Sequence, residues 1–118
     1  MAEQLDSWDK AREFARSLSG TESSTSYGKP CVKIAANGQT FLILGKEPET
    51  SFGVLIDLGT VEMLKETEPE TYWQSPHYQG YPAVLIRFDS NDPERVREVI
   101  SLAREQAAAK KPVRKRKS

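Results

Sequence analysis

Asn37-Gly38 is the feature that most constrains the fold of this chain. Both residues accept the positive φ that the two central positions of a type I′ turn require, so the pair predicts a tight β-hairpin. The alternating segments on either side, Cys31 to Ala35 and Thr40 to Leu44, are the strands that this turn would join. A looser turn from Gly45 to Ser51 leads to a third strand, Phe52 to Asp57. We expect these three strands to form an antiparallel meander.

Helical patterns occupy both ends of the chain. A first helix is expected from Ser7 to Leu18, with Asp6 or Ser7 as its cap. Its apolar residues fall on one face: Leu5, Trp8, Ala11, Ala15 and Leu18. A last helix should start at Asp92-Pro93, because Asp caps a helix and Pro suits its first position, and should end near Ala109. Its core-facing residues are Val96, Val99, Ile100, Ala103 and Ala107.

The segments between these elements complete the predicted fold. In chain order they are a Ser/Thr-rich loop from Ser19 to Ser26, a short helix from Thr60 to Glu66, a helical turn from Pro69 through Trp73, an irregular segment from Pro76 to Pro82 and a last strand from Ala83 to Phe88. The sum is an α+β fold, an antiparallel sheet of four or more strands packed against N- and C-terminal helices. The other face of the sheet is left for solvent or a partner.

A net charge of zero conceals an acidic body and a basic tail. The segment 110–118, KKPVRKRKS, holds six cations and no acid: Lys110, Lys111, Arg114, Lys115, Arg116 and Lys117. The other residues carry 17 − 6 = 11 cations against 17 acids, a net charge of −6. A run of like charges repels itself and buries no apolar surface, so residues 109–118 are expected to be disordered. Residues 1–108 are expected to form one globular domain.

Several classes of protein are excluded by composition. The longest apolar runs have four residues, against the roughly 20 that a membrane-spanning helix needs. The N-terminus, MAEQLDSWDK, lacks the pattern of a secretory signal, and the single Cys31 cannot form an internal disulfide. We therefore expect a cytoplasmic protein that does not associate with a membrane. A monomer is expected as well, although none of these features bears on the oligomeric state.

No motif in the chain indicates catalysis. The single His77 and Cys31 give no ligand pair at zinc spacing, and Gly45-Lys46 lacks the remaining residues of a phosphate-binding loop. Cys31 sits in an alternating strand, where a small buried thiol is ordinary and unreactive. We expect no catalytic residue, no metal and no cofactor, and hence a protein that is not an enzyme.

An aromatic cluster precedes and adjoins the last strand. Trp73, Tyr78 and Tyr81 lie close in sequence to His77 and to a strand that carries Arg87. Aromatic rings beside cations can stack nucleic-acid bases. The same rings can cover the edge of the sheet and the end of the core. Both interpretations remain open from the sequence.

Four segments resemble the MmcQ/YjbR family. They are EFARSLSGTE, SYGKPCVKIAANGQTF, EMLKETEPETYWQSPHYQGYPAVLIRFD and DPERVREVISLAREQA, and together they cover roughly residues 8–108. The most specific stretch is SPHYQGYPAVLIR. The resemblance implies a frataxin-like (CyaY-like) sandwich, described as a double-wing arrangement, and a bacterial source. Members are commonly described as DNA-binding proteins, and no catalytic residue or cofactor comes with the family.

The resemblance and the tail together predict a nucleic-acid-binding protein. The tail would supply phosphate contacts, and the candidate contact residues on the domain are Lys29, Lys33, His77, Tyr78 and Arg87. Family members often carry Lys where this chain has Gln39, and a basic residue in the third strand where it reads Ile56-Asp57. Both departures remove positive charge from the sheet. The alternative is a protein-interaction or small-ligand adaptor.

Overall fold

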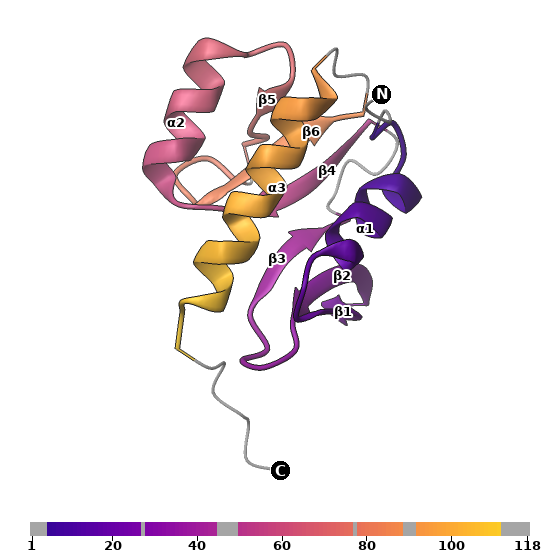
Figure 1. The fold of residues 1–118 in the computed structure, drawn as a ribbon. Helices are drawn as coiled ribbons and strands as arrows, with labels where there is room; N and C mark the ends of the chain where they lie inside the picture. Colours follow the sequence, from indigo (N-terminus) through magenta and orange to yellow (C-terminus); the bar gives the residue numbers. More distant parts are fainter. Residues whose placement is uncertain (1–4, 27, 45–49, 77, 89–91, 112–118) are drawn as a thin grey trace.

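The computed structural model describes residues 5–26, 28–44, 50–76, 78–88 and 92–111. Within them the chain forms three helices and six strands (Figure 1), which in chain order are α1 (Trp8–Ser17), β1 (Thr21–Ser26), β2 (Lys29–Ile34), β3 (Thr40–Ile43), β4 (Ser51–Leu55), α2 (Leu58–Thr67), β5 (Tyr72–Trp73), β6 (Ala83–Arg87) and α3 (Pro93–Ala108). The strands build one sheet in the order β1-β2-β3-β4-β6-β5, and every neighbouring pair is antiparallel. The predicted α+β fold is confirmed.

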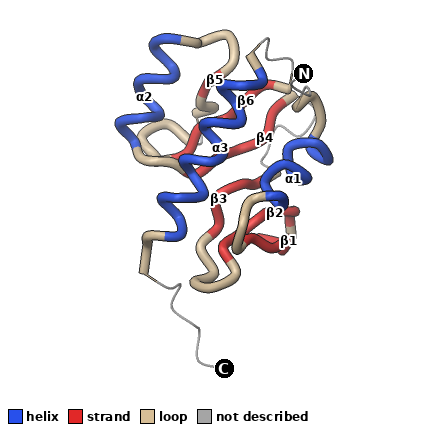
Figure 2. The backbone as a smooth tube through the Cα atoms, in the orientation of Figure 1, coloured by secondary structure: helices blue, strands red, loops and turns tan. Residues whose placement is uncertain are grey.

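One hydrophobic core joins the helices to the sheet. Helices α1 and α3 lie across the same side of the strands, and α2 flanks β5 and β6 (Figure 2). The predicted apolar stripes point into this core, because Ala11 and Ala15 of α1 are buried and so are all five core-facing residues of α3. The strands contribute cross-strand rows such as Val32, Leu42, Val54 and Val84. None of the helices in the described residues is long and apolar enough to cross a membrane.

A β-bulge in β3 thickens the core. Val32 pairs with Leu42 and Lys33 with Thr40, so Phe41 is skipped in the register. Phe41 and Leu42 are both fully buried in the core cluster. The bulge therefore places two large apolar side chains toward the helices where a regular strand would place one.

The second face of the sheet is less open than the sequence predicts. Its central row runs through Cys31, Ile43, Gly53, Leu85 and Trp73, and Cys31 and Leu85 are only 1% exposed. A Cβ on Gly53 would lie 2.8 Å from Ile43 Cγ1, so the Ile43 side chain lies against the bare backbone of β4. This close contact is one reason that the centre of the second face is covered.

Strand β1 occupies the segment predicted to be a loop. The residues Thr21–Ser26, TESSTS, pair with β2 along their whole length. Thr21 Oγ1 donates to the carbonyl oxygens of Ala15, at 3.1 Å, and Leu18, at 2.9 Å, near the end of α1. The loop prediction was wrong because TESSTS has no apolar alternation, and its pairing with β2, rather than its composition, determines its conformation.

The predicted helical turn from Pro69 through Trp73 was wrong for its last two residues, which form a strand. Glu68 ends α2, and its carbonyl oxygen accepts hydrogen bonds from the N–H groups of Thr71 and Tyr72, which close a tight turn. Tyr72 and Trp73 then form β5, where they pair with Ile86 and Leu85. The sheet edge that β6 offers decides the conformation of this segment.

The β2–β3 turn and the start of α2 differ from what the sequence predicts. The β2–β3 hairpin is confirmed, but its turn is not a two-residue connection, because the last backbone bond joins Ile34 N–H to Gln39 C=O at 2.8 Å with four residues between them. Gly38 has a positive φ of 74°, as expected. Helix α2 begins at Leu58, earlier than the predicted Thr60, because Asp57 ends the preceding segment and caps the helix through the Thr60 N–H.

Candidate nucleic-acid interface

The base of the basic tail is held against the β2–β3 hairpin. The Asn37 side-chain amide donates to the carbonyl oxygens of Ala107, at 2.8 Å, and Lys110, at 3.1 Å. The Gln39 amide donates to the Lys111 carbonyl oxygen at 2.6 Å. The end of α3 therefore has partners for its last carbonyl groups, and the chain leaves the domain beside the hairpin (Figure 1).

Two of the six tail cations fall within the described residues. Lys110 and Lys111 are exposed, so their charged ends face solvent while their backbones are bonded to the hairpin. The other four predicted tail contacts lie outside the described residues: Arg114, Lys115, Arg116 and Lys117. Gln39 stands where family members often carry Lys, and here its side chain holds the base of the tail.

The two predicted lysines of β2 lie at opposite ends of that strand. Lys33 Nζ is 3.8 Å from Glu22 Oε2 on β1, and the two residues face each other in the register. This partly exposed ion pair offsets the charge of Lys33 and contributes little to stability. Lys29 is exposed at the start of β2 and makes no ion pair with any described residue. Lys29 is therefore the more available of the two for an anionic ligand.

Arg87 forms a compact site with Trp73 and Ser51. The Arg87 Cζ lies 4.8 Å from the centroid of the Trp73 ring, within the range of a cation–π contact. Trp73 Nε1–H donates to Ser51 Oγ at 3.0 Å, and Ser51 pairs with Arg87 across β4 and β6. Ser51 is fully buried, so it holds the indole ring at a fixed position beside the guanidinium. The sequence placed Ser51 in a turn and gave no signal for this contact.

The remaining aromatic residues are organised by Gln74. Its buried amide donates to the carbonyl oxygens of Tyr78, Tyr81 and Ala83, at 2.9, 3.0 and 2.7 Å. Tyr78 is half-buried, and burial raises the pKa of its hydroxyl. Tyr81 is 60% exposed, and the predicted contact His77 lies outside the described residues. Trp73 thus follows the sheet-edge interpretation, whereas Tyr81 is free to meet a ligand.

The predicted contact residues do not converge on one patch. Arg87 and Lys29 lie at the same end of the sheet, but three strand positions separate β2 from β6, roughly 14 Å at about 4.8 Å for each step. Lys33 and the base of the tail lie at the other end, beside the β2–β3 hairpin. A single partner that contacts both groups would have to span the length of a strand.

Cys31 has the environment of an unreactive thiol. It is 1% exposed, and burial raises its pKa, although a hydrogen bond with Thr40 and the charge of Lys33 act in the opposite direction. Fewer thiolate anions form at neutral pH when the pKa is raised, so the thiol is a poor nucleophile. The described residues contain no group of three or more His, Cys, Asp or Glu side chains that could hold a metal ion.

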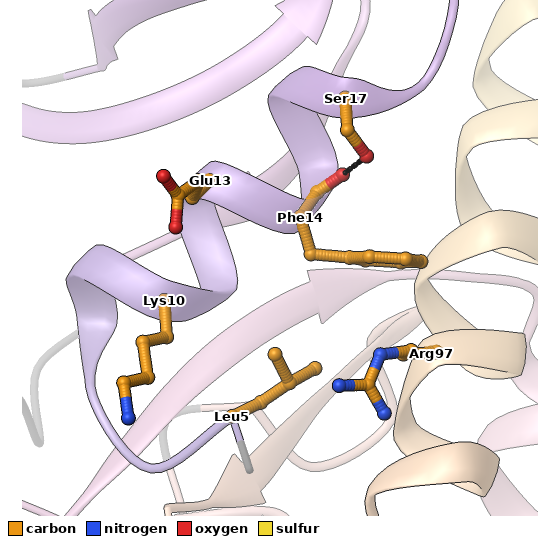
Figure 3. Close-up of a pocket in the computed structure, with 6 residues that line it drawn as sticks. All are labelled: Leu5, Lys10, Glu13, Phe14, Ser17 and Arg97. Atoms are coloured by element: carbon orange, nitrogen blue, oxygen red, sulfur yellow. Dashed lines mark hydrogen bonds between the residues drawn. The ribbon is translucent and has the colours of Figure 1, made fainter. Parts of the chain in front are cut away.

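A small cavity lies between α1 and α3 (Figure 3). It is an open pocket of about 250 Å³, lined by Leu5, Lys10, Glu13, Phe14, Ser17 and Arg97. Arg97 reaches from α3 toward α1, with its Cζ 5.8 Å from the centroid of the Phe14 ring. The volume lies slightly below the roughly 300–1,000 Å³ of ligand pockets. The lining mixes apolar walls with charges of both signs.

The comparisons with known proteins support the fold. The structure is similar to the crystal structure of Deinococcus radiodurans protein DR2400, a DUF419-domain protein, with a TM-score of 0.75 and 14% sequence identity. The similarity covers 93% of this chain and 84% of that one. DUF419 is the MmcQ/YjbR-like family, so the neighbour agrees with the resemblance at the level of the fold. No family model and no curated protein matches the sequence.

Proposed function

We propose that this chain is a non-enzymatic nucleic-acid-binding protein of the MmcQ/YjbR type, with DNA as its ligand. The observation that carries the proposal is the basic segment 110–118, which starts from a point fixed by Asn37 and Gln39. A fixed base limits where the six cations can reach, and so lowers the entropy lost when they bind phosphates. Binding through phosphates does not depend on the base sequence.

In this proposal the domain positions the ligand and the tail supplies the affinity. Arg87 presents a guanidinium beside Trp73, and Tyr81 is exposed nearby in sequence. Such groups can stack on bases or contact a phosphate. The domain itself has a net charge of −6 without the tail, so it would repel DNA once the tail is removed.

A salt titration of DNA affinity tests the proposal. If all six cations reach phosphates, the log–log slope of affinity against salt would be about −5, at ~0.9 for each contact on duplex DNA. Deletion of residues 110–118 should weaken binding strongly at low salt and flatten this slope. Unchanged affinity and slope would reject the tail model, and no binding by the full chain at about 50 mM salt would reject the nucleic-acid function itself.

Two variants that lose the same charge distinguish phosphate contacts made by the tail from an effect of the net charge of the protein. Replacing Lys110 and Lys111 with Gln removes two cations and should reduce the slope by about 2. Replacing Lys10 and Arg12 with Gln removes the same charge from α1, where both side chains already pair with Asp6 and Asp9. The second variant should leave the slope nearly unchanged. Arg87→Ala should have a smaller effect on affinity than either tail change.

The second candidate function is a small-ligand adaptor. The cavity between α1 and α3 favours it, because Phe14 and Leu5 give apolar walls and Arg97 gives a cation. If the full chain fails to bind DNA at low salt, a screen of small organic anions against wild type and Arg97→Gln would test this candidate. A ligand whose affinity is lost in Arg97→Gln would support the adaptor function.

A further inference from the structure

Within the described residues, no strand lies against the outer edge of β1, so the N–H and C=O groups along this edge could bond to another strand. Strand β1 lies at the end of the sheet, and within the described residues only β2 and α1 make extensive contact with it. The Ala35 N–H donates to the Gly20 carbonyl oxygen at 2.8 Å, which fixes the hydrogen-bonding phase of the β1–β2 ladder. Alternate residues then bond to β2 through Glu22, Ser24 and Ser26. The N–H and C=O groups of Thr21, Ser23 and Thr25 point outward.

This edge lacks the features that usually prevent strand addition. Edge strands are commonly protected by Pro, Lys, a bulge or a covering element. Strand β1 pairs with β2 in one unbroken register and contains neither Pro nor Lys. Its single charged residue is Glu22, whose carboxylate is near Lys33. The opposite edge, β5, is only two residues long, so β1 is the edge that can accept a strand.

We propose that β1 pairs with β1 of a second copy of this chain in an antiparallel, two-fold arrangement centred on Ser23. The hydrogen-bonding phase requires outward-pointing residues to face each other. Among the registers that do so, this one forms the most pairs, with Ser23 opposite Ser23 and Thr21 opposite Thr25. Three pairs with two hydrogen bonds each would form across the axis. The two six-stranded sheets would become one continuous sheet.

The side chains of β1 allow a second copy to pair with it, and they set how the pairing depends on salt. In this register Glu22 lies opposite Ser24, so no like charges face each other across the new ladder. Small hydroxyl side chains also allow a close approach of the two backbones. The guanidinium of Arg16, which donates to Ser23 Oγ at 3.2 Å, would come near its symmetry mate at the axis. Because salt screens that repulsion, pairing should strengthen as salt rises.

The pairing should be weak and reversible. A contact between two polar edge strands buries less surface than the roughly 1,200 Å² of a standard stable interface. We therefore expect a dimer that forms at high protein concentration, with a dissociation constant in the submillimolar range. Its salt dependence is opposite to that of DNA binding, so the two proposals can fail independently.

Sedimentation equilibrium of the full chain over a range of concentrations and salts tests this inference. Ser23→Pro removes an outward N–H without removing a bond to β2, because Pro is tolerated on edge strands when the N–H faces solvent. It should weaken association at least tenfold and leave the fold intact by circular dichroism. Thr25→Lys, an edge charge opposite Thr21, should weaken association as well, and Thr25→Ser should not.

The outcomes separate the alternatives. Association that rises with salt and is lost in Ser23→Pro or Thr25→Lys supports the paired edge. A chain that stays monomeric at millimolar concentration overturns the inference. Association that persists in folded Ser23→Pro and in Thr25→Lys also overturns it, because the contact would then lie on another surface. Deletion of residues 110–118 should leave the dimer intact, and loss of the dimer on that deletion would place the contact in the tail.

Discussion

The middle of α3 and its C-terminal end are held by different kinds of contact. In the middle, Val96, Val99, Ile100 and Ala103 are buried against the sheet at helical spacing. At the end, polar side chains from distant segments hold the helix. Gln106 exchanges two hydrogen bonds with Asp57, at 3.0 and 2.6 Å, and Asn37 and Gln39 bind the carbonyl groups that follow.

The difference shows which contacts local sequence can encode. Apolar contacts need only a repeated pattern within one helix, and any complementary core face satisfies them. The polar contacts at the end join residues 49, 70 and 72 positions apart, and each depends on one donor meeting one acceptor. The first kind should give large losses of stability when broken, and the second kind small losses with local effects.

The largest expected effect is in the middle of α3. Val99 is 5% exposed, so Val99→Asp would bury a carboxylate without a partner and should lower the free energy of unfolding by about 3–5 kcal/mol. Leu102→Asp is the matched control, because Leu102 is on the same helix and 40% exposed. Urea unfolding of both variants measures the difference. Equal losses in the two variants would contradict the assignment of Val99 to the core.

The next largest loss of stability is expected at Gly53, whose backbone is in contact with the Ile43 side chain. Gly53→Ala would add a Cβ 2.8 Å from Ile43 Cγ1, so either the side chain or the strand must shift. We expect a loss of about 1–3 kcal/mol, in the range of overpacked cores. Ile43→Ala removes the obstructing atoms, so the double variant should lose less than the sum of the two single variants. Additive losses in a double-mutant cycle would show that Ile43 does not limit this position.

The end of α3 should respond to Asn37→Ala. The change removes the amide that binds the Ala107 and Lys110 carbonyl oxygens and the oxygen that accepts the Gln39 N–H. We expect a loss of about 1–2 kcal/mol, the range for a helix cap and a partly buried hydrogen bond. Hydrogen exchange at the last turn of α3 should accelerate more than exchange at its centre.

Asp92→Ala provides the comparison at the other end of α3. Asp92 Oδ1 accepts the Arg95 N–H at 3.1 Å, a cap that the sequence predicted from Asp92-Pro93. The change should cost about 1 kcal/mol and accelerate exchange in the first turn instead. Exchange that changes uniformly along α3 in both variants would contradict the view that each cap acts locally.

The sequence predicted the elements whose signals are local. The stripe of α3, the cap at Asp92 and the hairpin after Ile34 are each encoded within a single element or turn. Strands β1 and β5 were missed because the edges of β2 and β6 determine their conformation, and TESSTS carries no apolar alternation.

The sequence predicted which residue types belong to the candidate site, but not how these residues are arranged. Arg87 and the tail cations stand out by residue type alone. The Ser51 contact that fixes Trp73, the Glu22 partner of Lys33 and the Gln39 bond to the tail each join segments that meet only after folding. Residue type therefore indicates which side chains could bind nucleic acid, and long-range pairing decides which of them are available.

The smallest expected effect is the loss of stability at acid pH when the Asp57 carboxyl is protonated. Hydrogen bonds from the Gln106 amide and from the Thr60 hydroxyl and N–H hold the pKa of the Asp57 carboxyl below its usual range. Because the folded pKa is the lower one, this contribution to stability is complete above the unfolded pKa, about 3.9, and is lost as the pH falls through the folded pKa. Asp57 is exposed, so solvent screening keeps the contribution small.

Unfolding in urea at a series of pH values from neutral to acid checks this sign. Asp57→Asn should be slightly less stable than wild type at neutral pH, and the two curves should approach each other below about pH 4. In Gln106→Ala the carboxylate stays but loses the partner that lowers its pKa most, so the acid-dependent loss should shrink. Parallel curves for wild type and Asp57→Asn would show that this polar contact contributes no pH-dependent stability.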